Sequence, residues 1–253
     1  MERTAVTIVT GAGRGIGRAI ALRMAKQTTV MVVGRTSEDL LSVRDEIIAR
    51  GGSANYMAGD VADPETARRT IDFIVGGSSV VRNLVCSAGI AKSGATESFD
   101  TDLWKEILDV NVNGSFHFVK ACLPHMLQEK RGAICLISST AGLYGYSHTA
   151  AYCASKHALV GMAKSLAVEH GKNGIVSVAI CPGFVESEMT TRSIRSLAAR
   201  RGFTEAEARE RIARVNPQRR IMPPEEVAET VAFICSGKAS SLSGNPLVLS
   251  GGE

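Results

Sequence analysis

The sequence predicts a single α/β domain of the Rossmann class, built around a doubly wound parallel sheet with helices on both faces. Short apolar segments alternate with helical segments, the first apolar segment ends in a glycine-rich turn, and no linker or repeat divides residues 1–253. Strands that alternate with helices imply βαβ crossovers, and these give a parallel sheet covered on both sides. A chain of 253 residues that is 45% hydrophobic can bury the core this fold needs.

The first half of the chain is predicted to hold three strands, each followed by a helix. Gly51 closes the second helix, and Asp63 is suited to cap the third, in which Pro64 takes the favoured first position. Apolar periodicity places the strands at residues 4–10, 30–33 and 54–58 and the helices at residues 15–26, 37–50 and 64–75.

The second half continues the alternation and then changes character. Strands are expected at residues 84–86, 133–137 and 175–181, a long helical region at 101–130 and a helix at 150–171. After Ser187 two further helices are expected, at 193–201 and 204–214, broken at Gly202. Thr204 with Glu207 has the spacing of a capping box, which marks the start of the second of them.

Composition and charge exclude several classes of function. The net charge is only +4 and aromatic residues make up 5% of the chain, so we expect no nucleic-acid partner. The apolar runs fall far below the ~18 residues of a membrane span, and the N-terminus leaves no room for a signal peptide. Six dispersed cysteines without a CxxC pair and five scattered histidines indicate reduced thiols and no metal site. We therefore expect a cytoplasmic protein.

The turn after the first strand indicates nucleotide binding. It reads Thr10-Gly11-Ala12-Gly13-Arg14-Gly15-Ile16-Gly17, so the glycine spacing is GxxxGxG and Ile16 takes the place of the last glycine in the strict GxGxxG fingerprint. Such a turn lets the backbone approach a pyrophosphate, and the helix N-terminus adds free N–H groups and the positive end of its dipole. A glycine turn can also be purely structural, but its place in a βαβ chain favours the nucleotide.

The end of the second strand bears on the choice between the two nicotinamide cofactors. An acidic residue there would bind the ribose 2′-hydroxyl of NAD, but this chain has Gly34-Arg35-Thr36-Ser37. Arg35, with Arg14 on the other side, can hold a 2′-phosphate, and one charge-assisted hydrogen bond is worth roughly 1.5–3 kcal/mol. The alternative is two solvated surface arginines. NADP(H) is the predicted cofactor.

Three side chains form a candidate catalytic set. Tyr152 and Lys156 lie at i and i+4 on one helix face, and Ser139 follows the fifth strand. An ammonium about 4 Å from a phenol, at an effective dielectric near 20, is worth about 4 kcal/mol, which would lower the phenol pKa from about 10 towards 7. The pair alone is common on ordinary helices, but its combination with Ser139 and the glycine turn is much rarer.

With these motifs in this order, nearly the whole chain resembles the short-chain dehydrogenases/reductases. The positions that match are the glycine turn, Asp60-Val61, Ser87-Ala88-Gly89, Asn111, the Ser139/Tyr152/Lys156 set, the segment from Pro182 through Gly183 and Val185 to Ser187, and the helix start at Pro224. Two of them depart from the family: Ser87 stands where it has asparagine, and Ser187 where it usually has threonine. The resemblance also implies a seventh strand near 247–249 and a homotetramer.

The resemblance implies a role for each of these residues. Tyr152 exchanges the proton of the substrate oxygen, Ser139 hydrogen-bonds that oxygen, Lys156 lowers the Tyr152 pKa and holds the ribose hydroxyls, and Asn111 holds a water. Asp60 and Val61 meet the adenine, Ser87, Ala88 and Gly89 line the cofactor cleft, and Pro182, Gly183, Val185 and Ser187 meet the nicotinamide. A hydride would pass between the cofactor and a carbonyl or carbinol carbon, while Tyr152 gives or takes the proton of the oxygen.

The substrate is predicted from the segment at about 187–217, which is suited to act as a lid. Seven arginines between Arg192 and Arg214 face only Glu205, Glu207 and Glu210, so this is either a solvated helix face or a lid that attracts an acidic substrate. Lys130, Arg131 and Lys172 lie close to positions that meet the acyl carrier protein in the family's fatty-acid ketoreductases.

The overall pattern is most similar to the 3-oxoacyl-(acyl-carrier-protein) reductases, which implies NADPH-dependent reduction of a 3-oxoacyl thioester on a carrier protein or coenzyme A. The alternatives are an NAD(P)-dependent dehydrogenase of another small or cyclic alcohol and a non-catalytic nucleotide-sensing protein. A sensor would be expected to lose Tyr152 or Lys156, and both are present.

Overall fold

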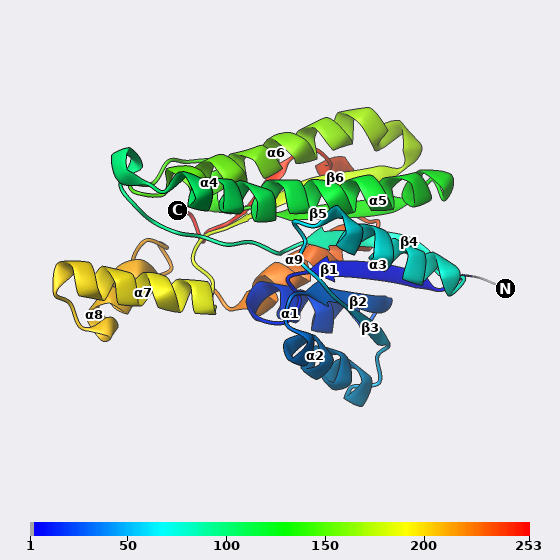
Figure 1. The fold of residues 1–253 in the computed structure, drawn as a ribbon, viewed down its shortest axis with the longest axis horizontal. Coiled ribbons are helices and arrows are strands. Elements are labelled where there is room, and N and C mark those ends of the chain that lie inside the picture. The colour runs from blue at the N-terminus through cyan, green and yellow to red at the C-terminus, as the bar shows by residue number, and fades with distance from the viewer. Residues whose placement is uncertain (1–2) are drawn as a thin grey trace.

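The computed structural model describes residues 3–253, and in it seven strands form one parallel sheet (Figure 1). The strands run in the order β3-β2-β1-β4-β5-β6-β7, and each neighbouring pair is parallel. Their bounds are β1 (Ala5–Thr10), β2 (Thr29–Gly34), β3 (Ala54–Ala58), β4 (Val80–Cys86), β5 (Gly132–Ile137), β6 (Ile175–Pro182) and β7 (Pro246–Leu249). The predicted fold class is confirmed.

Helices cover both faces of the sheet. They are α1 (Gly15–Met24), α2 (Ser37–Ala49), α3 (Pro64–Gly76), α4 (Thr101–Leu108), α5 (Gly114–Gln128), α6 (Ala150–His170), α7 (Glu188–Arg201), α8 (Glu205–Ala213) and α9 (Pro224–Cys235). Along β5, Cys135 and Ile137 pack into the core under α1, α2 and α9, whereas Ile134 and Leu136 pack under α3, α5 and α6. Because successive side chains point to opposite faces, strands buried on both sides read as continuous apolar runs.

Strand β4 begins four residues before the predicted start at Leu84. Arg82 and Asn83 interrupt the apolar run in the sequence, but Asn83 is buried and its Nδ2 donates to Thr7 Oγ1 at 2.9 Å. A buried amide is tolerated when it is hydrogen-bonded, and here the partner lies on the neighbouring strand, 76 residues away. The polar residues therefore belong to the strand.

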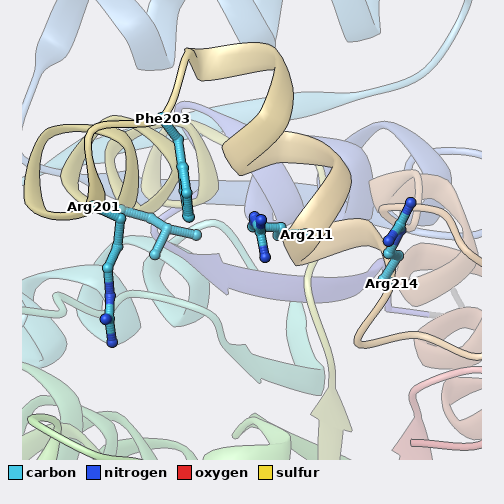
Figure 2. Close-up of a pocket in the computed structure, with 5 residues that line it drawn as sticks. Arg201, Phe203, Arg211 and Arg214 are labelled. Carbon is cyan, nitrogen blue, oxygen red and sulfur yellow. The ribbon is translucent and has the colours of Figure 1, made fainter.

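The predicted lid consists of α7 and α8, which lie beyond the carboxyl ends of the strands (Figure 1). Helix α7 begins at Glu188, five residues before the predicted start, because Ser187 Oγ accepts the N–H of Thr190 at 3.2 Å and caps it. The capping box of Thr204 and Glu207 at α8 is confirmed. The two helices share a small apolar core and border an open hollow (Figure 2).

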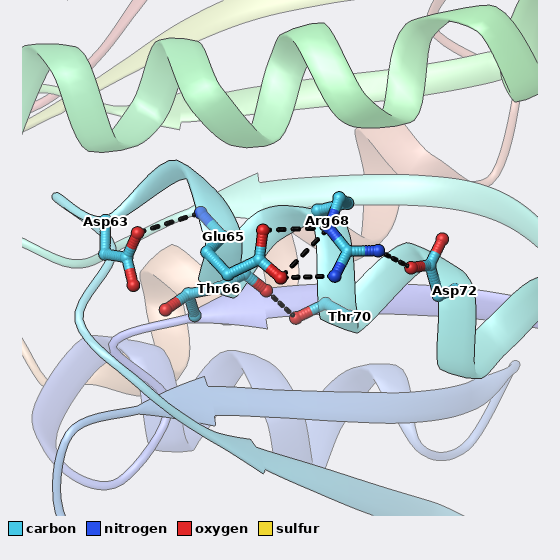
Figure 3. A network of polar contacts seen from close by, with 6 residues as sticks. All are labelled: Asp63, Glu65, Thr66, Arg68, Thr70 and Asp72. Atoms are coloured by element: carbon cyan, nitrogen blue, oxygen red, sulfur yellow. Dashed lines mark hydrogen bonds and ion pairs between the residues drawn. The ribbon is translucent and has the colours of Figure 1, made fainter.

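The predicted cap of α3 is also confirmed. Asp63 Oδ1 accepts the N–H of Glu65 at 2.9 Å, and Thr70 Oγ1 donates to the Thr66 carbonyl at 2.7 Å (Figure 3). Arg68 joins Glu65 and Asp72 by ion pairs along the exposed face. Exposed pairs of this kind contribute little to stability, so the apolar side of α3 and its cap hold the helix on the sheet.

Candidate active site

The strand order reverses between β1 and β4, and the carboxyl ends of these two neighbours define the site. In open α/β sheets, ligands bind at this switch point. Thr10 Oγ1 accepts the N–H groups of Ser87 at 3.1 Å and Ala88 at 3.2 Å, which joins the two strand ends. The junction uses the backbone of residue 87, so the shorter Ser87 side chain leaves it intact.

The glycine turn lies at this junction and has no room for side chains. Gly11 has φ +65°, and a Cβ added to it would lie 2.7 Å from the Ala88 Cα. A Cβ on Gly17 would lie 2.1 Å from the Gly11 carbonyl oxygen. Helix α1 starts at Gly15 (φ +54°), and Arg14 at its N-cap makes no side-chain capping bond. A close backbone and an uncapped helix N-terminus fit the pyrophosphate of a dinucleotide, as predicted.

Arg14 and Arg35 are both exposed near the glycine turn. A Cβ on Gly13 would lie 2.8 Å from the Asp39 Cβ, so the turn packs against the start of α2, which follows Arg35 closely. Arg14 forms an ion pair with Glu188, the first residue of α7. Glu188 was not singled out from the sequence; Arg192 and then Arg14 hold its carboxyl pKa below the ordinary value.

Asp60 and Val61 follow β3 towards the same cleft. Asp60 Oδ1 accepts the N–H of Ala62 at 2.9 Å, which fixes the turn. Val61 is buried, and a Cβ on Gly114 of α5 would lie 2.7 Å from its Cγ2. The absence of a side chain at Gly114 therefore lets α5 approach this loop.

Tyr152, Lys156 and Ser139 come together as predicted. Lys156 is buried, with its Nζ 5.5 Å from the centroid of the Tyr152 ring, and Ser139 is close enough to the Tyr152 phenol to affect its pKa. The predicted electrostatics are wrong, however. Burial raises the Tyr152 pKa to about 12 and outweighs the lowering effect of Ser139, while burial lowers the Lys156 pKa to about 8. The Lys156 Nζ donates instead to the Ile137 carbonyl at 2.8 Å.

Asn111 lies in a five-residue π-helical turn, Asp109–Asn113, that divides the predicted helix 101–130 into α4 and α5. Its Oδ1 accepts the Ile90 N–H at 2.8 Å, and its Nδ2 donates to the Ile90 carbonyl at 3.0 Å and to Ser155 Oγ at 2.9 Å. Ser155 Oγ donates to the Tyr152 carbonyl at 2.7 Å. Asn111 is thus a positioning residue for the Tyr152 helix, and Ser155, buried between Tyr152 and Lys156, was missed from the sequence.

Gly89 lies close to both Asn111 and Lys156. A Cβ at this position would lie 3.2 Å from Asn111 Oδ1 and 3.5 Å from Lys156 Nζ. The predicted cofactor segment after β4 therefore meets the predicted catalytic set. This contact places the ammonium of Lys156 at the cleft.

The segment after β6 forms the opposite wall. The Gly183 N–H donates to the Leu249 carbonyl at 2.9 Å, and Val185 is buried. A Cβ on Gly15 would lie 3.6 Å from the Ser187 Cβ, so the start of the lid meets the glycine turn. Pro182, Gly183, Val185 and Ser187 thus run along the cleft from the sheet to the lid.

Tyr146 and Glu253 were also missed from the sequence. The Tyr146 hydroxyl bonds Thr140 Oγ1 at 3.0 Å and donates to the Glu253 carboxylate, and a Cβ on Gly183 would lie 3.0 Å from Glu253 Oε2. Burial, with the hydrogen bond to Glu253, raises the Tyr146 pKa to about 12. Residues 107 positions apart meet here, and no local sequence pattern signals such a contact.

The basic residues Lys130, Arg131 and Lys172 lie at the other end of the sheet. Lys130 and Arg131 precede the first residue of β5, and Lys172 precedes β6, whereas Ser139 and Gly183 follow the ends of these strands. Within one chain these three side chains therefore do not border the cleft. Residues 3–253 hold no helix long and apolar enough to cross a membrane, and no cluster of three or more potential metal ligands.

A doubly wound sheet with a glycine turn at its switch point and a tyrosine and lysine beside it defines a nicotinamide-dependent oxidoreductase. The profile described as "short chain dehydrogenase" matches residues 5–197. Cyclohexanol dehydrogenase of Acinetobacter sp. (strain SE19) is 33% identical over 97% of this chain and 93% of its own. The 3-oxoacyl-[acyl-carrier-protein] reductase FabG of Staphylococcus aureus (strain N315) is 32% identical over 100% of this chain and 99% of its own.

A solved structure of a single-site variant of the actinorhodin polyketide ketoreductase with NADPH superposes with a TM-score of 0.94 at 33% identity, covering 98% of this chain and 96% of that one. The chain therefore belongs to the short-chain dehydrogenase/reductase family. It is an oxidoreductase whose fold binds a nicotinamide cofactor.

Proposed function

We propose that the protein is an NADPH-dependent reductase that converts a 3-oxoacyl thioester into the 3-hydroxyacyl thioester. The observation that carries this proposal is the positive charge around the cleft: Arg14 and Arg35 beside the glycine turn, and seven arginines against five glutamates between Glu186 and Arg214. Charge of this sign favours a 2′-phosphate on the cofactor and an acidic carrier on the substrate. Similarity to FabG and to the ketoreductase solved with NADPH supports it.

The cofactor would be held by the residues of the switch point. Gly11, Gly15, Ile16 and Gly17 would offer backbone N–H groups to the pyrophosphate, with Arg14 and Arg35 at the 2′-phosphate. Asp60 and Val61 would meet the adenine, Ser87, Ala88 and Gly89 would line the cleft, and Pro182, Gly183, Val185 and Ser187 would meet the nicotinamide. When bound, the cofactor supplies a hydride to the carbonyl carbon.

The chain's own residues would supply the proton and orient the substrate. Tyr152 donates its phenolic proton to the substrate oxygen, so that hydride and proton together turn the carbonyl into a hydroxyl. Burial keeps the phenol protonated at neutral pH, and it donates the proton when negative charge develops on the substrate oxygen. Ser139 hydrogen-bonds the same oxygen, and the Lys156 ammonium stabilises the phenolate that remains. Asn111 and Ser155 hold the Tyr152 helix in place.

The second candidate is a dehydrogenase of a small cyclic alcohol, which the similarity to cyclohexanol dehydrogenase favours. The two are separated by comparing kcat/KM for acetoacetyl-CoA and for cyclohexanone, both with saturating NADPH. We expect at least a ten-fold higher value for acetoacetyl-CoA, because only the thioester can use the arginine-rich lid. A higher value for cyclohexanone would overturn the thioester proposal in favour of the second candidate.

A further inference from the structure

The lid helices α7 and α8 border an open hollow that lies apart from the catalytic residues. Its volume is about 480 Å³, and it is lined by Leu197, Arg201, Phe203, Arg211 and Arg214 (Figure 2). Phe203 lies in the turn between the helices, partly buried against their shared core. The hollow therefore combines one aromatic side chain with three guanidinium groups.

Phe203 and Arg211 form a stacked pair. The Arg211 guanidinium carbon lies 4.2 Å from the centroid of the Phe203 ring, and Figure 2 shows Arg211 between Phe203 and Arg214. A guanidinium stacked on an aromatic ring gives a flat surface on which a nucleobase can stack. The same guanidinium groups bind phosphate through paired N–H donors.

The charge of the hollow is only partly compensated. Three arginines outside the hollow have carboxylate partners: Arg192 has Glu188, Arg195 has Glu205 and Arg209 has Glu186. Within the hollow, Arg214 is paired with Glu210. Within residues 3–253, no ion pair links Arg201 or Arg211 to a carboxylate within 4 Å.

The acid next to Arg211 is already engaged. Glu207 Oε2 accepts from Thr204 N at 2.8 Å and from Thr204 Oγ1 at 2.9 Å, and these bonds lower the Glu207 pKa more than Arg211 does. Glu207 therefore serves as the cap of α8. The hollow keeps a surplus of positive charge for an anionic ligand.

The hollow also lies at the same end of the sheet as the cleft. Arg209 of α8 is ion-paired with Glu186, and Glu188 of α7 with Arg14 of the glycine turn, so both helices are tied to the wall of the cleft. Lys130, Arg131 and Lys172, by contrast, precede the strands at the opposite end. A ligand anchored on the lid can extend a flexible arm towards Tyr152 of the same chain.

From these observations we propose that the hollow binds the adenosine 3′,5′-bisphosphate end of coenzyme A, and that this protein takes free coenzyme A thioesters. The adenine stacks on Phe203 and Arg211. Arg201 binds the phosphates, together with the N–H groups of Arg214 that Glu210 does not occupy. This inference rests on the proposed function and names the carrier. A carrier protein would bring no purine to the hollow, so the pocket distinguishes the two carriers.

The test is calorimetric titration of adenosine 3′,5′-bisphosphate into the enzyme saturated with NADPH, which blocks the nucleotide site at the glycine turn. We expect one equivalent to bind, and Arg211→Gln and Phe203→Leu each to weaken binding about ten-fold. Arg195→Gln is the matched control, because it removes the same charge from the lid outside the hollow. No binding to the wild type, or equal weakening by Arg195→Gln and Arg211→Gln, would overturn the proposal.

A kinetic arm separates this inference from the proposed function. KM is compared for acetoacetyl-CoA and for the acetoacetyl thioester of N-acetylcysteamine, which lacks the nucleotide. Arg211→Gln should raise the KM ratio of the first to the second about ten-fold. If Arg211→Gln reduces both thioesters and its KM ratio is the same as that of the wild type, the nucleotide site is contradicted and the proposed function is not. If the wild-type protein binds adenosine 3′,5′-bisphosphate but reduces neither thioester, the proposed function is contradicted and the nucleotide site is not.

Discussion

Replacing Tyr152 with phenylalanine is expected to lower kcat at least a hundred-fold while NADPH binding is retained. The phenylalanine ring fills the same space on α6, so the substitution removes only the hydroxyl beside Ser139. General acid–base catalysis contributes about 10²- to 10⁴-fold, which sets the size of the loss. Steady-state kinetics gives kcat, and the fluorescence change of NADPH on titration gives its affinity.

The matched control is Tyr144→Phe, because Tyr144 lies between Ser139 and Tyr152 in the sequence and its side chain is exposed. It should leave kcat unchanged. A Tyr152→Phe enzyme that keeps more than a tenth of the wild-type kcat would show that another group donates the proton, and the proposed mechanism would then be wrong.

Replacing Lys156 with methionine is expected to lower kcat by about two orders of magnitude. The Lys156 Nζ lies 5.5 Å from the centroid of the Tyr152 ring, so its positive charge would stabilise the phenolate that remains after proton transfer. Methionine fills the buried volume without the charge. Lys164→Met, an exposed change two turns along the same helix, is the control and should retain activity.

The same variant tests the environment of Lys156 through stability. Its pKa falls from 10.5 to about 8 in the folded protein, so between these values the unfolded chain binds more protons and the free energy of unfolding rises with pH. The rise attributable to Lys156 between pH 7 and 10.5 is about 3 kcal/mol. Urea denaturation without cofactor should show it in the wild type relative to Lys156→Met. An equal pH dependence in both would contradict burial of the ammonium.

The pattern of apolar residues was sufficient to predict most strands of the sheet, because strands buried on both faces appear in the sequence as apolar runs between helices. Strand β3 matches its prediction at 54–58, where Gly51 and Gly52 precede it and Gly59 follows it. Strand β4 was predicted too short because Asn83 looks like a loop residue until its partner, Thr7, is seen across the sheet. The division of α4 from α5 by a π-helical turn likewise depends on tertiary contacts of Asn111.

The site could be predicted to the extent that it depends on local spacing. Tyr152 and Lys156 lie one helical turn apart, so their common face follows from the sequence. Their pKa values do not, because these depend mainly on how deeply each group is buried. The contacts of Tyr146 with Glu253 and of Arg14 with Glu188 join distant segments and appear only in the structure.

The most direct test of the central claim is the rate of NADPH and of NADH oxidation, measured in parallel with acetoacetyl-CoA as the acceptor. A charge-assisted bond from Arg35 to the 2′-phosphate is worth roughly 1.5–3 kcal/mol, which corresponds to a ten- to hundred-fold preference. We therefore predict rapid oxidation of NADPH and at least ten-fold slower oxidation of NADH. A preference for NADH would contradict the assignment of Arg14 and Arg35. No oxidation of either cofactor, in a protein that still binds NADPH, would contradict reduction of a 3-oxoacyl thioester.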